Sequence, residues 1–174
     1  LAAYPVLRDG LVRSDDLDRI DLERHGAIRL GKPEELFNMR RLFAVMGMHP
    51  VGYYDLSVAG VPVHSTAFRP IDDDALRRNP FRVFTSLLRL ELIEDAQLRT
   101  EAEAILAKRE IFTPDALKLI YLAEKNGGLD RVQAEQFVAE ALETFRWHSD
   151  ATVSLETYQK LHDAHRLIAD VVCF

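Results

Sequence analysis

Cysteine and long apolar runs are what this chain has least of. Cys173 is the one cysteine among 174 residues, so an internal disulfide is excluded and a reducing compartment is favoured. No stretch approaches the roughly 20 apolar residues that span a bilayer, and the first residues lack the basic and apolar regions of a secretory signal. The sequence therefore predicts a cytoplasmic protein without a membrane partner.

Positive charge is also scarce. The chain has 22 Lys and Arg against 28 Asp and Glu, a formal net charge of -6, whereas nucleic-acid binding requires clustered positive charge. We therefore expect no nucleic-acid partner. The sequence also lacks a nucleophile elbow, a phosphate-binding glycine loop and a dinucleotide fingerprint. A hydrophobic content of 48% and this length are typical of a soluble domain with a sizeable core.

The first part of the chain alternates strands with a helix. Residue spacing and turn signals predict one strand, one helix and then three strands, with a turn at Ala59 and Gly60 in the hairpin and a solvated turn at residues 72–74. The strands are expected at residues 24–29, 48–56, 61–70 and 79–90, and the helix at residues 33–47. We therefore expect an α+β chain in which residues 1–93 form a strand module.

From residue 94 onward the apolar residues recur at helical spacing instead. About four helices are expected, and each begins at a residue of the type that caps helices. These capping residues are Asp95, Thr113, Asp130 and Ser154. Residues 94–174 should thus form a helical block. The chain begins at Leu1 without methionine and stops after an apolar run, residues 171–174, that resembles the start of a buried strand, so we expect a piece of a longer polypeptide.

The strand around residue 25 carries the strongest chemical signal. Side chains alternate along a strand, so His25, Ala27 and Arg29 share one face while Gly26 and Ile28 share the other. The Cα atoms of His25 and Arg29 should lie about 13 Å apart, with the small Ala27 leaving a gap between them. A metal on His25 and a short dicarboxylate reaching Arg29 would fill that gap.

Several longer phrases resemble one family. The order of strand, helix and three strands resembles the βαβββ module of the vicinal oxygen chelate superfamily, a half-barrel. More narrowly, the chain resembles the bacterial 2-oxoadipate dioxygenase/decarboxylase family, also called hydroxyglutarate synthase. The phrases that carry this resemblance extend over nearly the whole chain: RHGAIR, LFAVMGMHPVGYYDL, VPVHSTAFRP, NPFRVFTSLLRLELI and ETFRWH.

The resemblance implies an Fe(II) enzyme of lysine breakdown that uses O2 to convert 2-oxoadipate to 2-hydroxyglutarate with loss of CO2. In that family two His and one Glu hold the metal, and an Arg on the first strand binds the substrate. His25 and Arg29 match those positions. The other two ligands are expected beyond Phe174, in a second strand module of the same polypeptide, and the helical block is expected to cover the mouth of the site. Alone, this chain should be inactive.

His25 and Arg29 also have ordinary explanations. A strand histidine often donates to a nearby carbonyl, and an arginine often forms a surface ion pair. Their shared face favours the functional interpretation, because a planar guanidinium grips a carboxylate with two hydrogen bonds. A non-catalytic domain of the same fold, which binds a small anion or a partner without a metal, remains the alternative function.

Other residues of the strand module are weaker candidates. His64 could be a ligand, but a supporting or core role for it is about as compatible with the sequence, and Ser65 and Arg69 could contact substrate or pair across strands. Tyr53 and Tyr54 alternate faces, so at most one of them can enter a pocket, and core packing is their ordinary role.

The second half offers few candidates. His162 and His165 are three apart on an expected helix, a spacing that can share a metal, but no cysteine or carboxylate pattern completes a zinc site there. His148 beside Trp147 is expected in an aromatic corner of the helical block. Cys173 has no visible activation and is expected to be a small buried residue.

Overall fold

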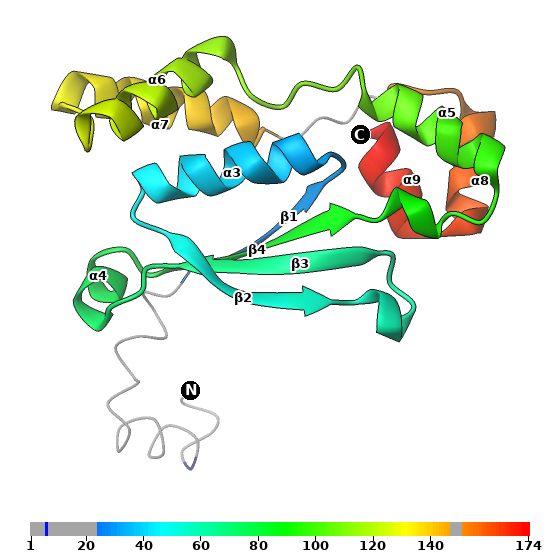
Figure 1. Cartoon of the computed structure of the whole chain (residues 1–174), viewed down its shortest axis with the longest axis horizontal. Helices are drawn as coiled ribbons and strands as arrows, with labels where there is room; N and C mark the ends of the chain where they lie inside the picture. The colour runs from blue at the N-terminus through cyan, green and yellow to red at the C-terminus, as the bar shows by residue number, and fades with distance from the viewer. Residues whose placement is uncertain (1–5, 7–23, 147–150) are drawn as a thin grey trace.

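The fold is built on one mixed sheet of four strands (Figure 1). The computed structural model describes residue 6 and residues 24–146 and 151–174. The strand order is β1-β4-β3-β2, with β1 parallel to β4 and the other two pairs antiparallel. The strands are β1 (Arg24–Leu30), β2 (His49–Asp55), β3 (Val63–Arg69) and β4 (Phe81–Leu88). The predicted βαβββ order and the α+β class are therefore confirmed.

Helix α3 (Pro33–Val45) connects β1 to β2 and covers one face of the sheet. Its start is stabilised by Glu35, whose Oε2 accepts hydrogen bonds from the backbone N–H groups of Gly31 (2.8 Å) and Lys32 (3.3 Å). Its buried side chains pack on strand residues, and the rings of Phe43 and Phe68 lie 5.1 Å apart. The opposite face of the sheet, which we call the open face, is left for other contacts.

Gly31 marks a close approach between two elements. A Cβ added to this residue would lie 2.4 Å from Cδ2 of Leu106 in helix α5 (Ala96–Leu106), which is far inside van der Waals contact. A side chain at this position would require Leu106 to move within its buried surroundings, so glycine is favoured where the chain leaves β1.

The predicted helix starts are confirmed. Each capping side chain, those of Asp95, Thr113, Asp130 and Ser154, accepts a hydrogen bond from a backbone N–H in the first turn of its helix. The helices are α5, α6 (Pro114–Asn126), α7 (Arg131–Thr144), α8 (Leu155–Ala164) and α9 (Arg166–Cys173). Single-turn helices η1 (Ser57–Ala59) and η2 (Leu90–Leu92) join strands to their neighbours.

Three local predictions were wrong. The run at residues 72–74, expected to be a turn, instead starts helix α4 (Asp73–Arg78), with Asp72 Oδ1 accepting from Ala75 N at 2.8 Å. The expected fourth helix is broken at His165, whose Nδ1 accepts from Leu167 N at 3.1 Å and starts α9. Residues 171–173 belong to this helix rather than to the start of a strand, because a short apolar run is compatible with either when it is buried.

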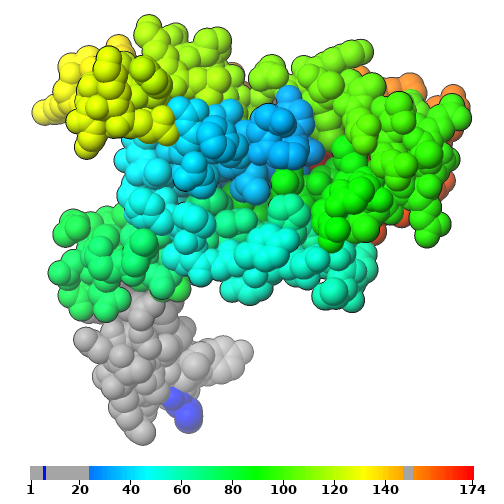
Figure 2. All heavy atoms as spheres, in the orientation of Figure 1, coloured from blue at the N-terminus to red at the C-terminus, as the bar shows by residue number. Residues whose placement is uncertain are grey.

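The later helices divide between two apolar cores. In the first core, α6 and α7 pack with α3 and the sheet face beneath it. Figure 2 shows the atoms of α3 filling the space between those helices and the strands. In the second core, α5, α8 and α9 pack with the ends of β3 and β4. Residues on both sides of the expected boundary at residue 93 therefore share each core.

A buried ion pair links helix α3 to the connection between α5 and α6. Glu35 is 3% exposed, and its Oε1 lies 3.1 Å from Nε of Arg109, which comes from the connection between α5 and α6. Nη1 of Arg109 also donates to the carbonyl of Val171 in α9 at 2.5 Å. Lys32 Nζ donates to the carbonyl of Arg109 and pairs with Glu110. The carboxylate of Glu35 thus joins the start of α3 to the connection between α5 and α6 and, through Arg109, to α9.

We expect Glu35→Ala to lower the free energy of unfolding of the full-length protein by about 3 kcal/mol, because it leaves a largely buried guanidinium without its carboxylate partner and two backbone N–H groups without their acceptor. Urea denaturation followed by circular dichroism measures this change. Glu110→Gln is the matched control, since that carboxylate is 78% exposed and its loss should change stability by less than about 1 kcal/mol. Similar small effects of both variants would contradict a stabilising role of the buried pair.

Candidate functional site

The open face of the sheet carries the predicted site residues. In the parallel register, His25 pairs with Arg82, Ala27 with Phe84, and Arg29 with Ser86. The alternate residues Gly26, Ile28 and Leu30 pair with residues of β4 that are buried under α3, namely Val83, Thr85 and Leu87. His25, Ala27 and Arg29 therefore lie on the face opposite α3, and their predicted shared face is confirmed.

Arg29 lies in a row of polar residues across the sheet. The register aligns it with Ser86 on β4, Ser65 on β3 and Tyr54 on β2. The hydroxyl oxygens of Ser65 and Ser86 are 2.7 Å apart and share a hydrogen bond, and Ser65 is 4% exposed. These two hydroxyls form a polar floor beside the guanidinium.

An aromatic pair lies next to this floor. The rings of Tyr54 and Phe84 are 6.0 Å apart, and both side chains are about half exposed. The side chain of Tyr54 folds back along its own strand over Gly52. A Cβ added to Gly52 would lie 3.0 Å from the tyrosine hydroxyl. Tyr53 lies on the other face, with its ring 5.4 Å from that of His64. One of the two tyrosines thus reaches the open face, as the alternation predicts.

The three candidates for a supporting role, His64, Ser65 and Arg69, lie in different surroundings. His64 pairs with Leu87 in the register and so lies on the face toward α3, away from His25. Arg69 shares the open face by strand alternation, but its Nη1 donates to the carbonyls of Pro70 (2.7 Å) and Ile71 (3.2 Å). Ser65 is therefore the candidate that lies in the row of Arg29, and the geometry gives His64 no contact with a ligand on the open face.

Arg29 has a partial ion pair. Its Nη1 lies 3.4 Å from Oδ2 of Asp170 in α9, and its side chain is 55% exposed. The same carboxylate oxygen lies 3.8 Å from Nε of Arg166. Two guanidinium groups thus share one carboxylate at the edge of the open face.

The sequence did not indicate Ser86, Phe84 or Asp170 as neighbours of the site. Their positions depend on the parallel pairing of β1 with β4 and on where α9 packs, which are contacts between segments far apart in the chain. The signal that could have identified Ser86 and Phe84 was the alternation of small and apolar residues in β4, taken together with the resemblance to a βαβββ module.

Metal ligands are sparse in the part of the chain that the structure describes. No group of three His, Cys, Asp or Glu side chains among residues 24–146 and 151–174 could hold a metal ion. His25 is exposed on the open face and offers one imidazole, a ligand type that suits Fe(II). His25 therefore fits the metal position that the family resemblance implies, provided that the remaining donors come from outside these residues.

The other candidates of the second half form no site. His162 lies in α8, whereas His165 ends that helix and uses Nδ1 as the acceptor that starts α9, so the expected pair on one helix is not formed. Residues 147 and 148 lie outside the described residues. The expectation of a small buried residue at Cys173 is confirmed, since it is fully buried.

Charged residues at the end of the β2–β3 hairpin are bound to one another. Nη1 of Arg89 lies 3.1 Å from Oδ2 of Asp55, and its Nε lies 2.8 Å from Oε1 of Glu91. Hydrogen bonds from Ser57, followed by the nearby Arg89, lower the pKa of Asp55. This cluster stabilises the end of the hairpin. The carboxylates of Asp55 and Glu91 already accept hydrogen bonds from Ser57 and Arg89.

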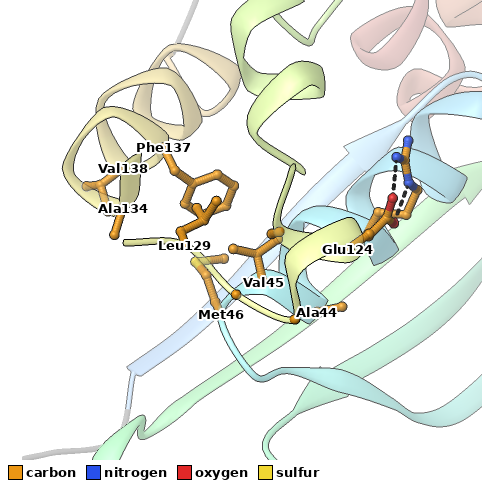
Figure 3. A pocket seen from close by; sticks show the side chains of 12 residues that line it. Ala44, Val45, Met46, Glu124, Leu129, Ala134, Phe137 and Val138 are labelled. Atoms are coloured by element: carbon orange, nitrogen blue, oxygen red, sulfur yellow. Dashed lines mark hydrogen bonds and ion pairs between the residues drawn. The ribbon is translucent and has the colours of Figure 1, made fainter. Parts of the chain in front are cut away.

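A separate cavity lies on the other side of α3 (Figure 3). It has a volume of about 530 Å³ and lies between the end of α3 and the turn from α6 to α7. Its wall is mostly apolar, and an ion pair from Arg41 to Glu124, with N–O distances of 2.8 and 2.7 Å, borders it. That hydrogen-bonded pair raises the pKa of Arg41 and lowers the pKa of Glu124. The cavity is remote from His25 and Arg29, across the sheet and α3.

Among the residues that the structure describes, no helix combines the length and apolar character needed to cross a bilayer.

The arrangement of the sheet and its helices is shared with a distantly related solved structure. A solved structure of a putative glyoxalase superfamily protein from Ralstonia eutropha superposes with a TM-score of 0.66 at 20% identity, over 96% of this chain and 56% of the other. A sequence model of the family described as 2-oxoadipate dioxygenase/decarboxylase matches residues 4–174. The chain belongs to this family.

Close relatives agree with this assignment. An Escherichia coli protein named 2-oxoadipate dioxygenase/decarboxylase is 64% identical over 170 residues, which are 98% of this chain and 38% of that protein. The crystal structure of the hydroxyglutarate synthase from Pseudomonas putida is 64% identical with a TM-score of 0.91, over 99% of this chain and 40% of the other. The same synthase in complex with 2-oxoadipate gives a TM-score of 0.90. The chain thus spans about two fifths of the length of these relatives.

We expect Cys173 to react slowly with iodoacetamide in the folded protein. Burial, together with the nearby charge of Asp170, raises the pKa of its thiol to about 11, so the reactive thiolate is nearly absent at pH 8. Mass spectrometry of the peptide that contains Cys173 should show alkylation about a hundredfold slower than in urea-unfolded protein. Equal rates before and after unfolding would contradict the buried position.

Proposed function

We propose that this chain forms the first part of an enzyme that oxidatively decarboxylates 2-oxoadipate with O2, giving 2-hydroxyglutarate and CO2. The observation that carries the proposal is that His25 and Arg29 share the open face of β1. The names of the relatives support the reaction, since one is called a 2-oxoadipate dioxygenase/decarboxylase and another is a hydroxyglutarate synthase solved with 2-oxoadipate. We further propose a role in lysine breakdown in the cytoplasm.

In this proposal His25 supplies one of the ligands of an Fe(II) ion. A neutral imidazole suits this metal, and a second His and a Glu from another part of the full-length protein complete the set that the family resemblance implies. Fe(II) held by two His and one carboxylate supplies open coordination positions for a 2-oxo acid and for O2.

Arg29 binds the far carboxylate of the substrate. Its guanidinium is more than half exposed on the open face, and it presents planar N–H groups that match a carboxylate. A residue four positions along the same strand fixes the distance between the metal end and the far end of the diacid, about 13 Å between Cα atoms. The small Ala27 leaves room between these two groups.

The side chains that surround the space between His25 and Arg29 are of two kinds, polar and aromatic. The hydroxyls of Ser65 and Ser86 lie in the row of Arg29, and because they share one hydrogen bond, one O–H of the pair is left to bind a carboxylate oxygen. The rings of Tyr54 and Phe84 shield the middle of this space from water and contact the methylene groups of the substrate. The open face therefore combines a polar end with an apolar middle, which suits a linear diacid.

Substitution of the two central residues in the full-length protein tests the proposal. We expect His25→Ala to reduce iron-dependent O2 uptake at least about a hundredfold, because a metal ligand is lost. Arg29→Ala should raise the KM for 2-oxoadipate about tenfold or more with a smaller change in kcat, because it removes binding at a distance from the reacting carbon. An oxygen electrode and metal analysis measure these effects.

His162→Ala is the matched control for the histidine, since this partly exposed side chain lies on α8 and not on the open face. It should retain wild-type turnover and metal content. Unchanged turnover in both the His25 and the Arg29 variants would refute the proposed roles.

A non-catalytic anion-binding domain is the second candidate, because an exposed guanidinium next to two hydroxyls can hold a carboxylate without any metal. Calorimetric titration of the full-length protein with 2-oxoadipate separates the two candidates. The enzyme should bind 2-oxoadipate more tightly with Fe(II) than with a chelator, whereas an anion-binding domain should bind equally in both and consume no O2.

A further inference from the structure

We propose that Asp170 is a positioning residue that holds the guanidinium of Arg29 in place for the far carboxylate of the substrate. The proposal rests on the function proposed above, in which Arg29 binds that carboxylate, and adds a determinant of diacid recognition from the helical block. The observation that carries it is the contact of 3.4 Å between Nη1 of Arg29 and Oδ2 of Asp170, which joins β1 to α9.

The backbone of Asp170 is rigidly placed. The residues around it in α9 are buried in the second core, together with Val63 and Leu88 at the ends of β3 and β4. The hydrogen bond from Arg109 to the carbonyl of Val171 holds the next residue of the helix. A long, exposed arginine side chain is therefore tied to a carboxylate whose own position is fixed by packing.

The contact with Asp170 leaves some of the N–H donors of Arg29 available to a substrate carboxylate. Val63 and Leu88 pair with each other one row beyond Ser65 and Ser86, so α9 covers the end of the open face that lies away from His25. Asp170 therefore contacts Arg29 from the side opposite His25. A guanidinium has five N–H donors, and the contact uses those of Nη1 alone. The donors on Nε and Nη2 remain for a substrate carboxylate.

The local charge remains favourable for a diacid. Asp170 lies between two cations, since Nε of Arg166 is 3.8 Å from the same oxygen that contacts Arg29. Two positive charges and one negative charge leave a net positive charge beside the open face. Asp170 can thus orient Arg29 without cancelling its attraction for a carboxylate.

Steady-state kinetics of the full-length, iron-loaded protein test the inference. Asp170→Asn should raise the KM for 2-oxoadipate about two- to fivefold, the range that a partly exposed ion pair supplies, with kcat within about twofold of wild type. The KM for 2-oxohexanoate, which has a methyl group in place of the far carboxylate, should not change. In the Arg29→Ala background the Asp170→Asn change should have no further effect on KM.

Asp163→Asn is the matched control, because this carboxylate is exposed on the neighbouring helix α8 and should leave both KM values unchanged. A lower KM for 2-oxoadipate in Asp170→Asn would overturn the inference, since it would identify Asp170 as a competitor of the substrate. An unchanged KM, or equal changes for the two substrates, would overturn it as well.

Failure of the proposed function gives a different result. A wild-type protein that neither consumes O2 with 2-oxoadipate nor binds it would refute the function and the inference together. An active wild type in which Asp170→Asn behaves like Asp163→Asn would refute the inference alone.

Discussion

The parallel pairing of β1 with β4 is the constraint on which the candidate site depends. β1 precedes the helix and the other three strands in the chain, yet it lies at the edge of the sheet next to the last of them. Its register decides which side chains of β4 face the same direction as His25 and Arg29. A shift of β1 by one residue would turn His25 and Arg29 toward α3 and would bring Gly26, Ile28 and Leu30 to the open face. The chemistry of that face is thus fixed by backbone hydrogen bonds.

The buried carboxylate of Glu35 has a comparable role between the two cores. It stabilises the start of α3 and pairs with Arg109, which in turn binds α9. Because α9 carries Asp170, the same set of contacts reaches from the interior to the edge of the open face. The helical part of the chain is therefore joined to the sheet by specific polar bonds as well as by apolar packing, and it contributes a charged residue to the surroundings of Arg29.

Local signals predicted the elements well. The caps at Asp95, Thr113, Asp130 and Ser154 and the alternation in β1 depend on residues close together in sequence, so the sequence specified them. The break at His165 was missed because the helix stops for a side-chain bond to the backbone, and the apolar periodicity continues across it. The position of His64 was ambiguous, since alternation gives relative faces within one strand while the face toward α3 depends on the pairing of strands. Asp170 was not found because an ion pair across 141 residues leaves no local pattern.

The contact between Gly31 and Leu106 has a consequence for how related sequences can diverge. The two residues are 75 positions apart, but the side chain of Leu106 fills the space beside Gly31. A methyl group on Gly31 would overlap that side chain. A side chain at position 31 is accommodated most easily with a smaller residue at position 106, so we expect natural variation at these two sites to be correlated.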